Sequence, residues 1–503
     1  MPRWWLLFLL VMTLSFSASA RASSYLDVDD DAYSLLSRLE AVGVVRSALL
    51  STRPISRAEG VRLLHEAETN AEGRGAFIEG LVRELKRRIG PDVGGLKMMD
   101  SVYAKYVNTN ADVRTLTYGM AREQEQSLNA NNDGDVYSRG GNARIGFTSR
   151  MEDVAGFSLF LNPEFRSGQS TGNELVLKQG YVVYDFGWDL IAGRESQWWG
   201  PGYHGAILLT NNAEPFNMVR IANPKPVILP WVFKYLGPFD FTCFATQLER
   251  DRADVPAPYL WGMRMNFKPH PILEIGLERT SLLGGSGRPT TASTWLSQVI
   301  GRNDHSVGGS SSDTGDQRAG YDLKLTLPFA VQPIQAYMEA DGEDSYHGFL
   351  PRYWAYLYGL YLPQVLSIER LEFRLEWART FDKHADKPTS WYLNGIYTSG
   401  YTYNGRIIGH YMGTDSQDLF MELTCRVPEK NARVSLAYDR MEHNLSFDVN
   451  EREHELSIRT VLNLSDSTDI DLTYGYSWID NAENVPGAEQ RAHSAAGMVT
   501  KRF

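Results

Sequence analysis

The stretch TDIDLTYGYSWID, residues 468–480, alternates between two kinds of side chain. Its even positions are apolar or aromatic, namely Ile470, Leu472, Tyr474, Tyr476 and Trp478, whereas most odd positions are polar, including Asp469, Asp471, Thr473 and Ser477. Successive side chains of a β-strand point to opposite faces, so this pattern predicts a strand with one apolar and one charged face. A length of about 10–14 residues is typical of a strand that crosses a membrane at a tilt.

The same period of two recurs along the chain from about residue 100, as in YDLKLTL, LSIERLEFRLEW and VVYDFGWDL. Tight and long connections between these segments largely alternate, which is the pattern of short periplasmic turns and long external loops. The predicted strands are 111–123, 136–150, 155–166, 176–193, 205–211, 226–235, 239–250, 258–268, 272–283, 319–328, 333–342, 352–362, 366–380, 418–428, 432–444, 452–464, 468–480 and 491–503. Prolines interrupt the fifth and sixth of them.

Residues 21–99 have a helical pattern instead. Leu35, Leu36, Leu39 and Val42 recur at helical spacing, Ser56 and Glu59 form a capping box, and Gly90-Pro91 ends a third apolar stripe. Three short helices bury little surface, so we expect them to dock on the larger domain. We therefore predict an all-β transmembrane barrel of about 18 antiparallel strands over residues 100–503, with a small N-terminal helical bundle on the periplasmic side.

Residues 1–20 have the features of a signal peptide, with Arg3, an apolar run and Ala18-Ser19-Ala20. We expect an exported chain that is integral to the outer membrane. The formal net charge of −11 without a basic cluster argues against a nucleic-acid partner. Cys243 and Cys425 lie in distant predicted strands, so a disulfide bond between them is not expected. The terminal Phe503 resembles the signal that barrel-assembly machinery recognises, which makes that machinery and outer-membrane lipid the expected partners.

A catalytic constellation is not evident from the sequence. Asp469 and Asp471 share the lumen face about 7 Å apart, within the range of an inverting glycosidase pair. Lumen acids balanced by arginines explain the pair better, because such pairs recur in most of the predicted strands. The histidines lack metal-ligand spacing, and no nucleophile or phosphate-binding motif occurs. We predict a protein that is not an enzyme and that has neither cofactor nor metal.

One predicted loop is rich in aromatic and amide side chains. Residues 391–415 include Trp391, Tyr392, Asn394, Tyr397, Tyr401, Tyr403 and Tyr411. Aromatic rings stack on sugar rings and amides bind hydroxyl groups, so these residues are candidate polysaccharide contacts. The alternative is that they pack the loop into the mouth of the barrel, and the two interpretations are compatible.

Two further motifs, RESQWWGPGYHGAILLTNNAEP at 194–215 and NGRIIGHYMGTDS at 404–416, resemble those of the Wzi-type capsule-assembly proteins of the Gram-negative outer membrane. The helical segment with its RPISRAE pattern and the barrel ending in phenylalanine are similar too. The family positions are Arg194, Trp198, Trp199, Gly200, Pro201, Asn211, Asn212, Gly409, His410, Gly413 and Asp415. The resemblance implies an eighteen-stranded barrel with an occluded lumen and a lectin-like, non-catalytic role in holding capsular or extracellular polysaccharide at the cell surface.

Two other functions stay open. A barrel of about 16–18 strands can hold an aqueous pore, so a channel for small solutes or saccharides is the main alternative, and an outer-membrane hydrolase ranks third. The strand count places QWWGPGYHG, residues 197–205, after a downward strand and therefore at the periplasmic rim. There we expect Trp198 and Trp199 to have a structural role, such as packing the helical bundle.

Overall fold

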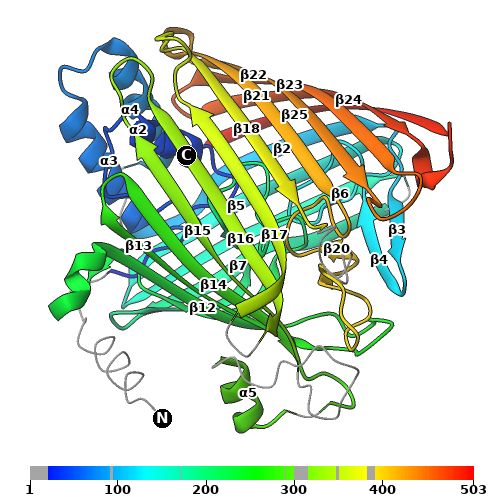
Figure 1. The fold of residues 1–503 in the computed structure, drawn as a ribbon. Helices are drawn as coiled ribbons and strands as arrows, with labels where there is room; N and C mark the ends of the chain where they lie inside the picture. Colours follow the sequence, from blue (N-terminus) through cyan, green and yellow to red (C-terminus); the bar gives the residue numbers. More distant parts are fainter. Residues whose placement is uncertain are drawn as a thin grey trace.

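Eighteen antiparallel strands close into a barrel in the computed structural model of the chain (Figure 1). The structure describes residues 21–90, 94–169, 172–288, 290–299, 315–346, 350–381 and 391–503, so the predicted signal peptide lies outside it. The wall strands are β2 (Gly95–Thr109), β5 (Gly140–Val154), β6 (Phe157–Gly168), β7 (Gly172–Asp185), β8 (Asp189–Glu195), β10 (Phe216–Ala222), β12 (Pro238–Gln247), β13 (Tyr259–His270), β14 (Leu273–Leu283), β15 (Gly315–Leu327), β16 (Ile334–Tyr346), β17 (Leu350–Leu362), β18 (Leu371–Arg379), β21 (Gln417–Val427), β22 (Ala432–His443), β23 (Glu451–Ser465), β24 (Thr468–Asp480) and β25 (Glu489–Arg502). Pairing of β2 with β25, for example Tyr103 opposite Thr500, closes the ring.

The predicted fold class is confirmed, but four predicted strands are wrong. The first wall strand is β2, and residues 111–123 lie instead in and around a hairpin of β3 (Arg114–Tyr118) and β4 (Ala121–Glu125). A register shift between Lys97 and Ser101 interrupts the alternation of β2, which hides it in the sequence. The predicted strands 205–211 and 226–235 are not wall strands, since the first is buried inside the barrel and the second contains only β11 (Val227–Ile228) and the 3-10 helix η1 (Trp231–Leu236).

The predicted strand 176–193 is in fact two strands, β7 and β8. They are joined by a turn at Phe186–Trp188, in which Asp185 pairs with Asp189 and Gly187 has a φ of 95°. Because the connection has three residues, odd-numbered positions face the same side of the wall before and after the turn, and so do even-numbered positions. The alternation therefore runs through the turn without a visible break, and the sequence pattern conceals the reversal.

The outer face of the wall is apolar, with aromatic rings gathered near both ends. Trp354, Tyr356, Tyr358 and Trp377 form a continuous stack with ring centroids 6.0 to 6.4 Å apart. Near the opposite end, Phe157, Tyr184 and Phe186 stack in the same way, at 4.7 and 6.2 Å. Such belts suit the two interfaces of a bilayer. In the described residues, no helix is long and apolar enough to cross a membrane.

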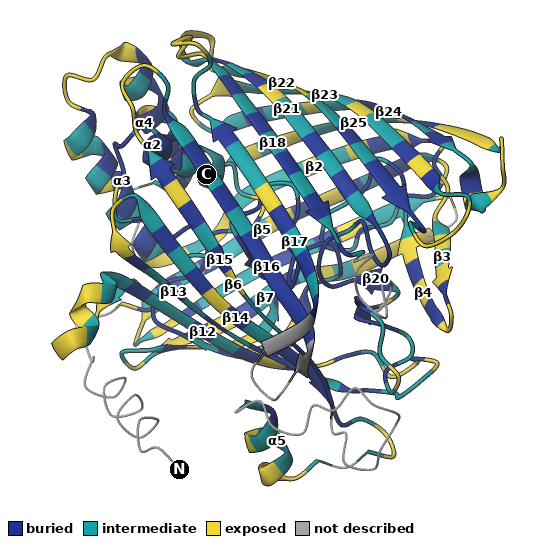
Figure 2. Ribbon diagram, viewed as in Figure 1, coloured by how far each residue is buried: buried dark blue, intermediate teal, exposed yellow. Residues whose placement is uncertain are grey.

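Three helices form the N-terminal bundle, α2 (Ala32–Ala41), α3 (Arg57–Ala71) and α4 (Ala76–Ile89). The Ser56 half of the predicted capping box is confirmed, because Ser56 Oγ accepts a hydrogen bond from Glu59 N at 3.0 Å where α3 begins, whereas the Glu59 carboxylate binds Arg62 instead. Leucines such as Leu35, Leu39 and Leu81 are fully buried between the helices. Figure 2 shows that the exposed residues of this bundle lie on its outer side, away from the barrel.

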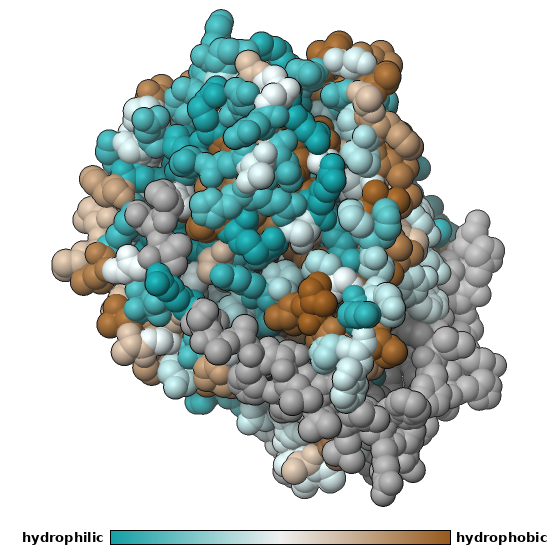
Figure 3. Space-filling view, turned by 90° about the vertical axis from the view of Figure 1, so that its left-hand side faces the viewer, coloured by the Kyte–Doolittle hydropathy of each residue, from teal (hydrophilic) through white to brown (hydrophobic). Residues whose placement is uncertain are grey.

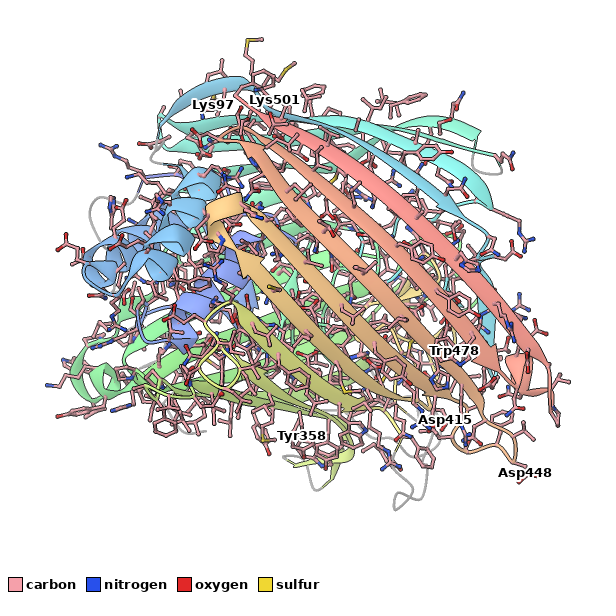
Figure 4. The ribbon with its side chains drawn as sticks, turned by 90° about the horizontal axis from the view of Figure 1, so that it is seen from above. Lys97, Tyr358, Asp415, Asp448, Trp478 and Lys501 are labelled. Carbon is pink, nitrogen blue, oxygen red and sulfur yellow. The ribbon has the colours of Figure 1, made fainter. Side chains whose placement is uncertain are left out.

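The bundle docks on one end of the barrel, as predicted. We call this the helical end and the opposite end, with Asp415 and Asp448, the loop end; Figure 4 shows them apart. At the helical end, hydrophilic side chains cover the centre and hydrophobic ones gather toward the edges (Figure 3). Buried ion pairs join the two parts, Arg38 with Glu372 and Lys324 with Glu40 at 3.0 Å.

Two smaller predictions can be compared with the structure. Cys243 and Cys425 are both free, as expected from their distant strands. Phe503 is 62% exposed and follows β25, with its backbone N–H donating to Asp100 O at 2.9 Å. Its role as an assembly signal stays a prediction.

Removal of the Arg38 guanidinium should loosen the helical bundle from the barrel. Arg38 and Glu372 are 1% and 4% exposed, and Arg38→Ala leaves a buried carboxylate without this partner. Because Glu372 keeps Arg426 as a partner, we expect a loss of about 1.5–3 kcal/mol of stability, measured by thermal unfolding of the purified barrel in detergent. Arg83→Ala on the exposed face of α4 is the matched control and should unfold as the wild type does. An Arg38→Ala barrel as stable as the control would contradict the docking role.

Candidate functional site: the lumen plug

Two segments of the chain enter the barrel and fill its lumen. The first lumen segment, residues 196–215, leaves β8 at the loop end, and the second lumen segment, residues 391–416, precedes β21. Residues from both contribute to the largest buried apolar cluster, including Trp199, Leu208, Tyr392 and Ile408, each 0% exposed. The two motifs found in the sequence therefore meet inside the barrel.

The prediction that QWWGPGYHG lies at the periplasmic rim is wrong. Trp198–Trp199 form the short strand β9, which pairs with β1 (Thr52–Arg53) of the N-terminal segment, deep inside the barrel. The error follows from the missed turn between β7 and β8, because one further strand reverses the direction in which the chain leaves the wall. The expected contact with the helical part is nevertheless present, since Arg53 lies over the Trp198 ring at 5.4 Å.

Trp199 is the anchor of the first lumen segment. Its ring is 0% exposed and meets Phe244 of β12 edge to face, with centroids 5.4 Å apart. Gly262 on β13 is required for this approach, because a Cβ atom there would lie 2.8 Å from the indole. The Trp199 backbone N–H donates to Leu209 O at 2.9 Å, which folds the segment back on itself. We infer that this residue fixes the segment against the wall.

A buried carboxylate holds the turn that follows. Glu339 of β16 accepts a hydrogen bond from Ile207 N at 2.6 Å, and its other oxygen lies against Gly200. A Cβ atom on Gly200 would be 2.4 Å from that oxygen, and φ at this position is 122°. Glycine at this position is therefore demanded both by space and by backbone conformation.

The two lumen segments are bonded to each other through Thr210 and Tyr392. Thr210 donates from its backbone to Ile408 O at 2.9 Å and from its hydroxyl to Gly409 O at 2.6 Å. The Tyr392 hydroxyl donates to Ile207 O at 2.5 Å and accepts from His410 N at 2.8 Å. A side chain on Gly409 would collide with Ile207 O at 2.1 Å. Gly409 and His410 of the second motif are therefore both needed where the two lumen segments meet.

Other motif residues have defined structural partners. Arg194 binds Glu214 at 2.6 Å, and the Asn212 amide donates to Ile407 O at 3.1 Å. Asn211 donates to Asp29 Oδ1 at 2.9 Å and so connects the N-terminal segment with the first lumen segment. Asp415 accepts from the Ser446 hydroxyl at 2.6 Å. Gly413 has a φ of 73°, and a Cβ atom there would meet Glu123 Oε2 at 2.3 Å. Pro201 directly follows Gly200 in the same turn.

Most of the aromatic candidates for polysaccharide contact are buried. Trp391, Tyr392, Tyr397, Tyr401 and Tyr403 are at most 7% exposed. The hydroxyls of Tyr397 and Tyr401 bond to Gly284 O at 3.0 Å and Thr280 at 3.1 Å, and Arg318 lies 4.3 Å from the Tyr401 ring. This packing corresponds to the second interpretation of the loop, in which it fills the barrel mouth. Asn394 and Tyr411 are partly exposed, and contact with a sugar stays a prediction for them.

The N-terminal residues contribute acids to the lumen that sequence reasoning did not single out. Asp27, Asp29 and Asp133 have carboxylate oxygens within 4.8 Å of one another, and Lys178 binds Asp133 at 2.9 Å. Burial, together with Asp133 and Asp27, raises the pKa of Asp29 to about 8. The DVDDD run at residues 27–31 was a visible signal, but nothing in it indicated that this part of the chain enters the barrel.

A polar cavity of about 740 Å³ remains between the N-terminal segment and the wall. It is lined by Tyr103, Lys105, Tyr203, His204, Asp439 and Arg459, among others. Asp469 and Asp471 also border it, and each is bound to arginine, Asp469 to Arg87 at 2.6 Å and Asp471 to Arg459 at 2.9 Å. This arrangement matches the interpretation of the pair as lumen acids balanced by arginines.

The closed wall, the apolar outer face and the plugged lumen define an outer-membrane β-barrel whose interior is occupied by its own chain. Comparison with known proteins gives the family. The model of the family "Capsule assembly protein Wzi" matches residues 118–494, and the chain belongs to that family.

Two similar proteins fit this assignment. An uncharacterized 55.8 kDa protein in the cps region of Klebsiella pneumoniae is 28% identical over 357 residues, which cover 69% of this chain and 63% of that protein, less than two thirds of its length. A solved structure of Wzi from Escherichia coli has a TM-score of 0.73 and 20% identity, and the match covers 96% of this chain and 100% of that one. That protein is described as an outer-membrane, carbohydrate-binding β-barrel involved in group 1 capsule assembly.

Truncation of Trp199 should weaken the whole barrel. Trp199→Ala removes a fully buried indole beside Phe244, and we expect a loss of about 3–5 kcal/mol, read as a lower unfolding temperature and less heat-resistant folded band. The control is Trp231→Ala in η1, where the indole is 60% exposed. Trp199→Ala with normal folding but lost polysaccharide binding would contradict a structural role.

The buried His410 should make the barrel sensitive to acid. Burial, with a smaller effect of His204, lowers the pKa of His410 from 6.5 to about 3. The unfolded chain therefore takes up a proton below pH 6.5 that the folded chain does not, so stability falls as the pH falls. Between pH 6.5 and 5 this amounts to about 2 kcal/mol, and His410→Gln should lose that much less over the same range. His65→Gln, at a 72% exposed side chain, should keep the wild-type pH dependence.

Proposed function

We propose that this protein binds capsular or extracellular polysaccharide at the cell surface and organises it there without catalysis. The observation that carries the proposal is the plugged lumen. An 18-stranded wall can surround a wide aqueous pore, but here the two lumen segments and the N-terminal segment occupy that space. The family membership and the description of the similar Escherichia coli barrel support a role in capsule assembly.

The loop end offers a polar surface for a polymer. The β3–β4 hairpin turns Thr115, Thr117, Arg122 and Gln124 outward, while Glu123 faces the plug. The hairpin is fixed to the second lumen segment, because Gln124 N donates to Gly405 O at 2.8 Å. Hydroxyl, amide and guanidinium groups bind sugar hydroxyls and carboxylates through hydrogen bonds. We assign the polymer to this loop-end surface, with Asn394 as a further candidate there and Tyr411 as a candidate on the side of the lumen cavity, which it borders.

The partners follow from the arrangement of the barrel in the membrane. The loop end faces the outside, the helical end faces the periplasm, and the apolar outer face contacts outer-membrane lipid. Phe503 at the helical end serves as the signal for the barrel-assembly machinery. Lumen acids such as Asp469 have a structural role, since arginines bind them.

A channel for small saccharides is the alternative, and the cavity of about 740 Å³ is the observation that favours it. Planar-bilayer conductance separates the two functions. We expect no large steady current from the purified barrel, because the plug is bonded to the wall at several points, including Glu339. A steady current that disappears when the cavity is narrowed by His204→Trp would favour the channel.

Loss of the loop-end groups should weaken polymer binding without harming the barrel. We expect Arg122→Ala combined with Gln124→Ala to bind capsular polysaccharide, purified from the source strain, about tenfold more weakly in a pull-down or biosensor assay. The matched control, Arg83→Ala with Lys86→Ala, removes exposed polar groups at the helical end and should bind normally. Deletion of the whole protein should release cell-associated polysaccharide. Unchanged cell-associated polysaccharide after deletion would count against the proposed function.

A further inference from the structure

Two aspartates of the barrel wall, Asp418 of β21 and Asp439 of β22, face a histidine of the first lumen segment, His204. The histidine Nε2 lies 3.1 Å from Asp439 Oδ2, and the three candidate ligand atoms all lie within 4.8 Å of one another. The aspartates are 3% and 4% exposed, whereas the His204 side chain is 27% exposed and borders the lumen cavity. The group is therefore buried on the wall side and open on the other.

The two aspartates have fewer hydrogen-bond donors around them than their oxygens can accept from. The Tyr411 hydroxyl lies 2.8 Å from Asp418 Oδ2 and 2.8 Å from Asp439 Oδ2. A hydroxyl has a single proton and can donate to only one of them. The second oxygen of each carboxylate, Oδ1, is buried and accepts no hydrogen bond. Buried carboxylates in this condition are stabilised either by a shared proton or by a bound cation.

The described residues do not supply a lysine or arginine at this site. Among the residues that the structure describes, the ion-pair partners of the two carboxylates are histidines only, His410 for Asp418 at 3.7 Å and His204 for Asp439 at 3.1 Å. Glu455 lies directly opposite Asp439 in the strand register and adds a further acid. The described residues therefore place three acids around one partly exposed histidine.

Three other acidic groups in the lumen each have a basic side chain nearby. The group of Glu125, His443 and Glu451 includes Arg114, which lies 2.9 Å from Glu451. Lys178 serves the group of Asp27, Asp29 and Asp133, and Arg264 binds Glu278 beside Glu339 and Asp341. In each of these three groups a basic side chain provides part of the compensating charge. The group around His204 is the one in which the described residues offer no lysine or arginine within ion-pair distance.

We propose that His204, Asp418 and Asp439 form a site for a divalent metal ion of the zinc type, with an open position toward the lumen cavity. One imidazole nitrogen and two carboxylate oxygens are suitable zinc ligands, and a fourth position filled by water or a ligand completes a tetrahedron. Tyr411 and Glu376 position the ligands. Glu376 accepts from His204 N at 2.8 Å, so the backbone of the histidine is fixed on the wall.

The open position gives the site a consequence for binding. A metal ion at the edge of the polar cavity can take a carboxylate or hydroxyl oxygen as its fourth ligand, which are the groups of an acidic saccharide. The metal would also join the first lumen segment to β21 and β22, because His204 comes from the plug and both aspartates come from the wall. Metal binding is therefore expected to stabilise the plugged barrel, independently of whether polysaccharide binds at the loop end.

The test measures zinc on the full-length barrel purified in detergent. After treatment with a chelator and dialysis against ZnCl₂, we expect the wild type to bind Zn²⁺ and to unfold at a higher temperature with the metal than without it. His204→Gln and Asp439→Asn should bind Zn²⁺ at least about tenfold more weakly and lose the thermal shift. Cobalt in place of zinc should give the intense visible absorption of a tetrahedral site in the wild type only.

The controls separate this site from other histidines and from folding defects. His454→Gln changes an outward histidine that stacks on Trp478 at 4.8 Å, and it should bind zinc as the wild type does. Asp418→Asn is the second variant if one of the others fails to show the heat-resistant folded band. Equal zinc binding by the wild type, His204→Gln and Asp418→Asn would overturn the proposal. A chelated Asp439→Asn barrel that is more stable than the wild type, with no zinc bound by either, would also overturn it and would show that the carboxylates share a proton.

Discussion

The space inside an 18-stranded wall is the constraint on which the rest of this structure depends. Wall side chains fill a barrel of about 8 strands, but they leave an aqueous channel in one of 16–18. This chain fills the space with its own backbone. Peptide groups are thereby buried in the lumen, where they cannot all form hydrogen bonds with solvent. Each of those groups needs a partner. The hydrogen bonds from Ile207 to Glu339 and from Gly200 to Ser51 O show how wall carboxylates and the N-terminal segment provide them.

The same constraint accounts for the composition of the two motifs. Glycines occur where backbone approaches backbone or carboxylate, as at Gly200 and Gly409, and a Cβ atom at either position would be within 2.4 Å of an oxygen. The tryptophans and tyrosines fill the larger gaps, and Trp199 requires Gly262 on the wall opposite it. The motif residues are thus those that allow the two lumen segments to pack against each other and against the wall.

The alternation of 468–480 was enough to predict the wall, because one face must meet lipid and the other must meet the lumen. It could not reveal the turn at Gly187, since a connection of three residues preserves the parity of inward and outward positions. Residues 205–211 were mistaken for a wall strand because burial in a plug and burial in lipid both select apolar residues. The ion-pair partners of the lumen charges could not be predicted from the sequence either, because residues hundreds of positions apart form these pairs, as in Arg38 with Glu372 and Arg87 with Asp469.

The distribution of charge separates two roles for the polar lumen. In most places a buried acid meets an arginine or lysine across the boundary between the wall and the parts inside or beneath it, and such pairs hold the plug and the helical bundle in position. Glu372 with Arg38 and Glu40 with Lys324 are examples, each nearly free of solvent. Around His204 the acids exceed the bases while the histidine stays open to the cavity. The described residues place no lysine or arginine within ion-pair distance of these aspartates, so this part of the lumen is suited to a positive charge from outside the chain.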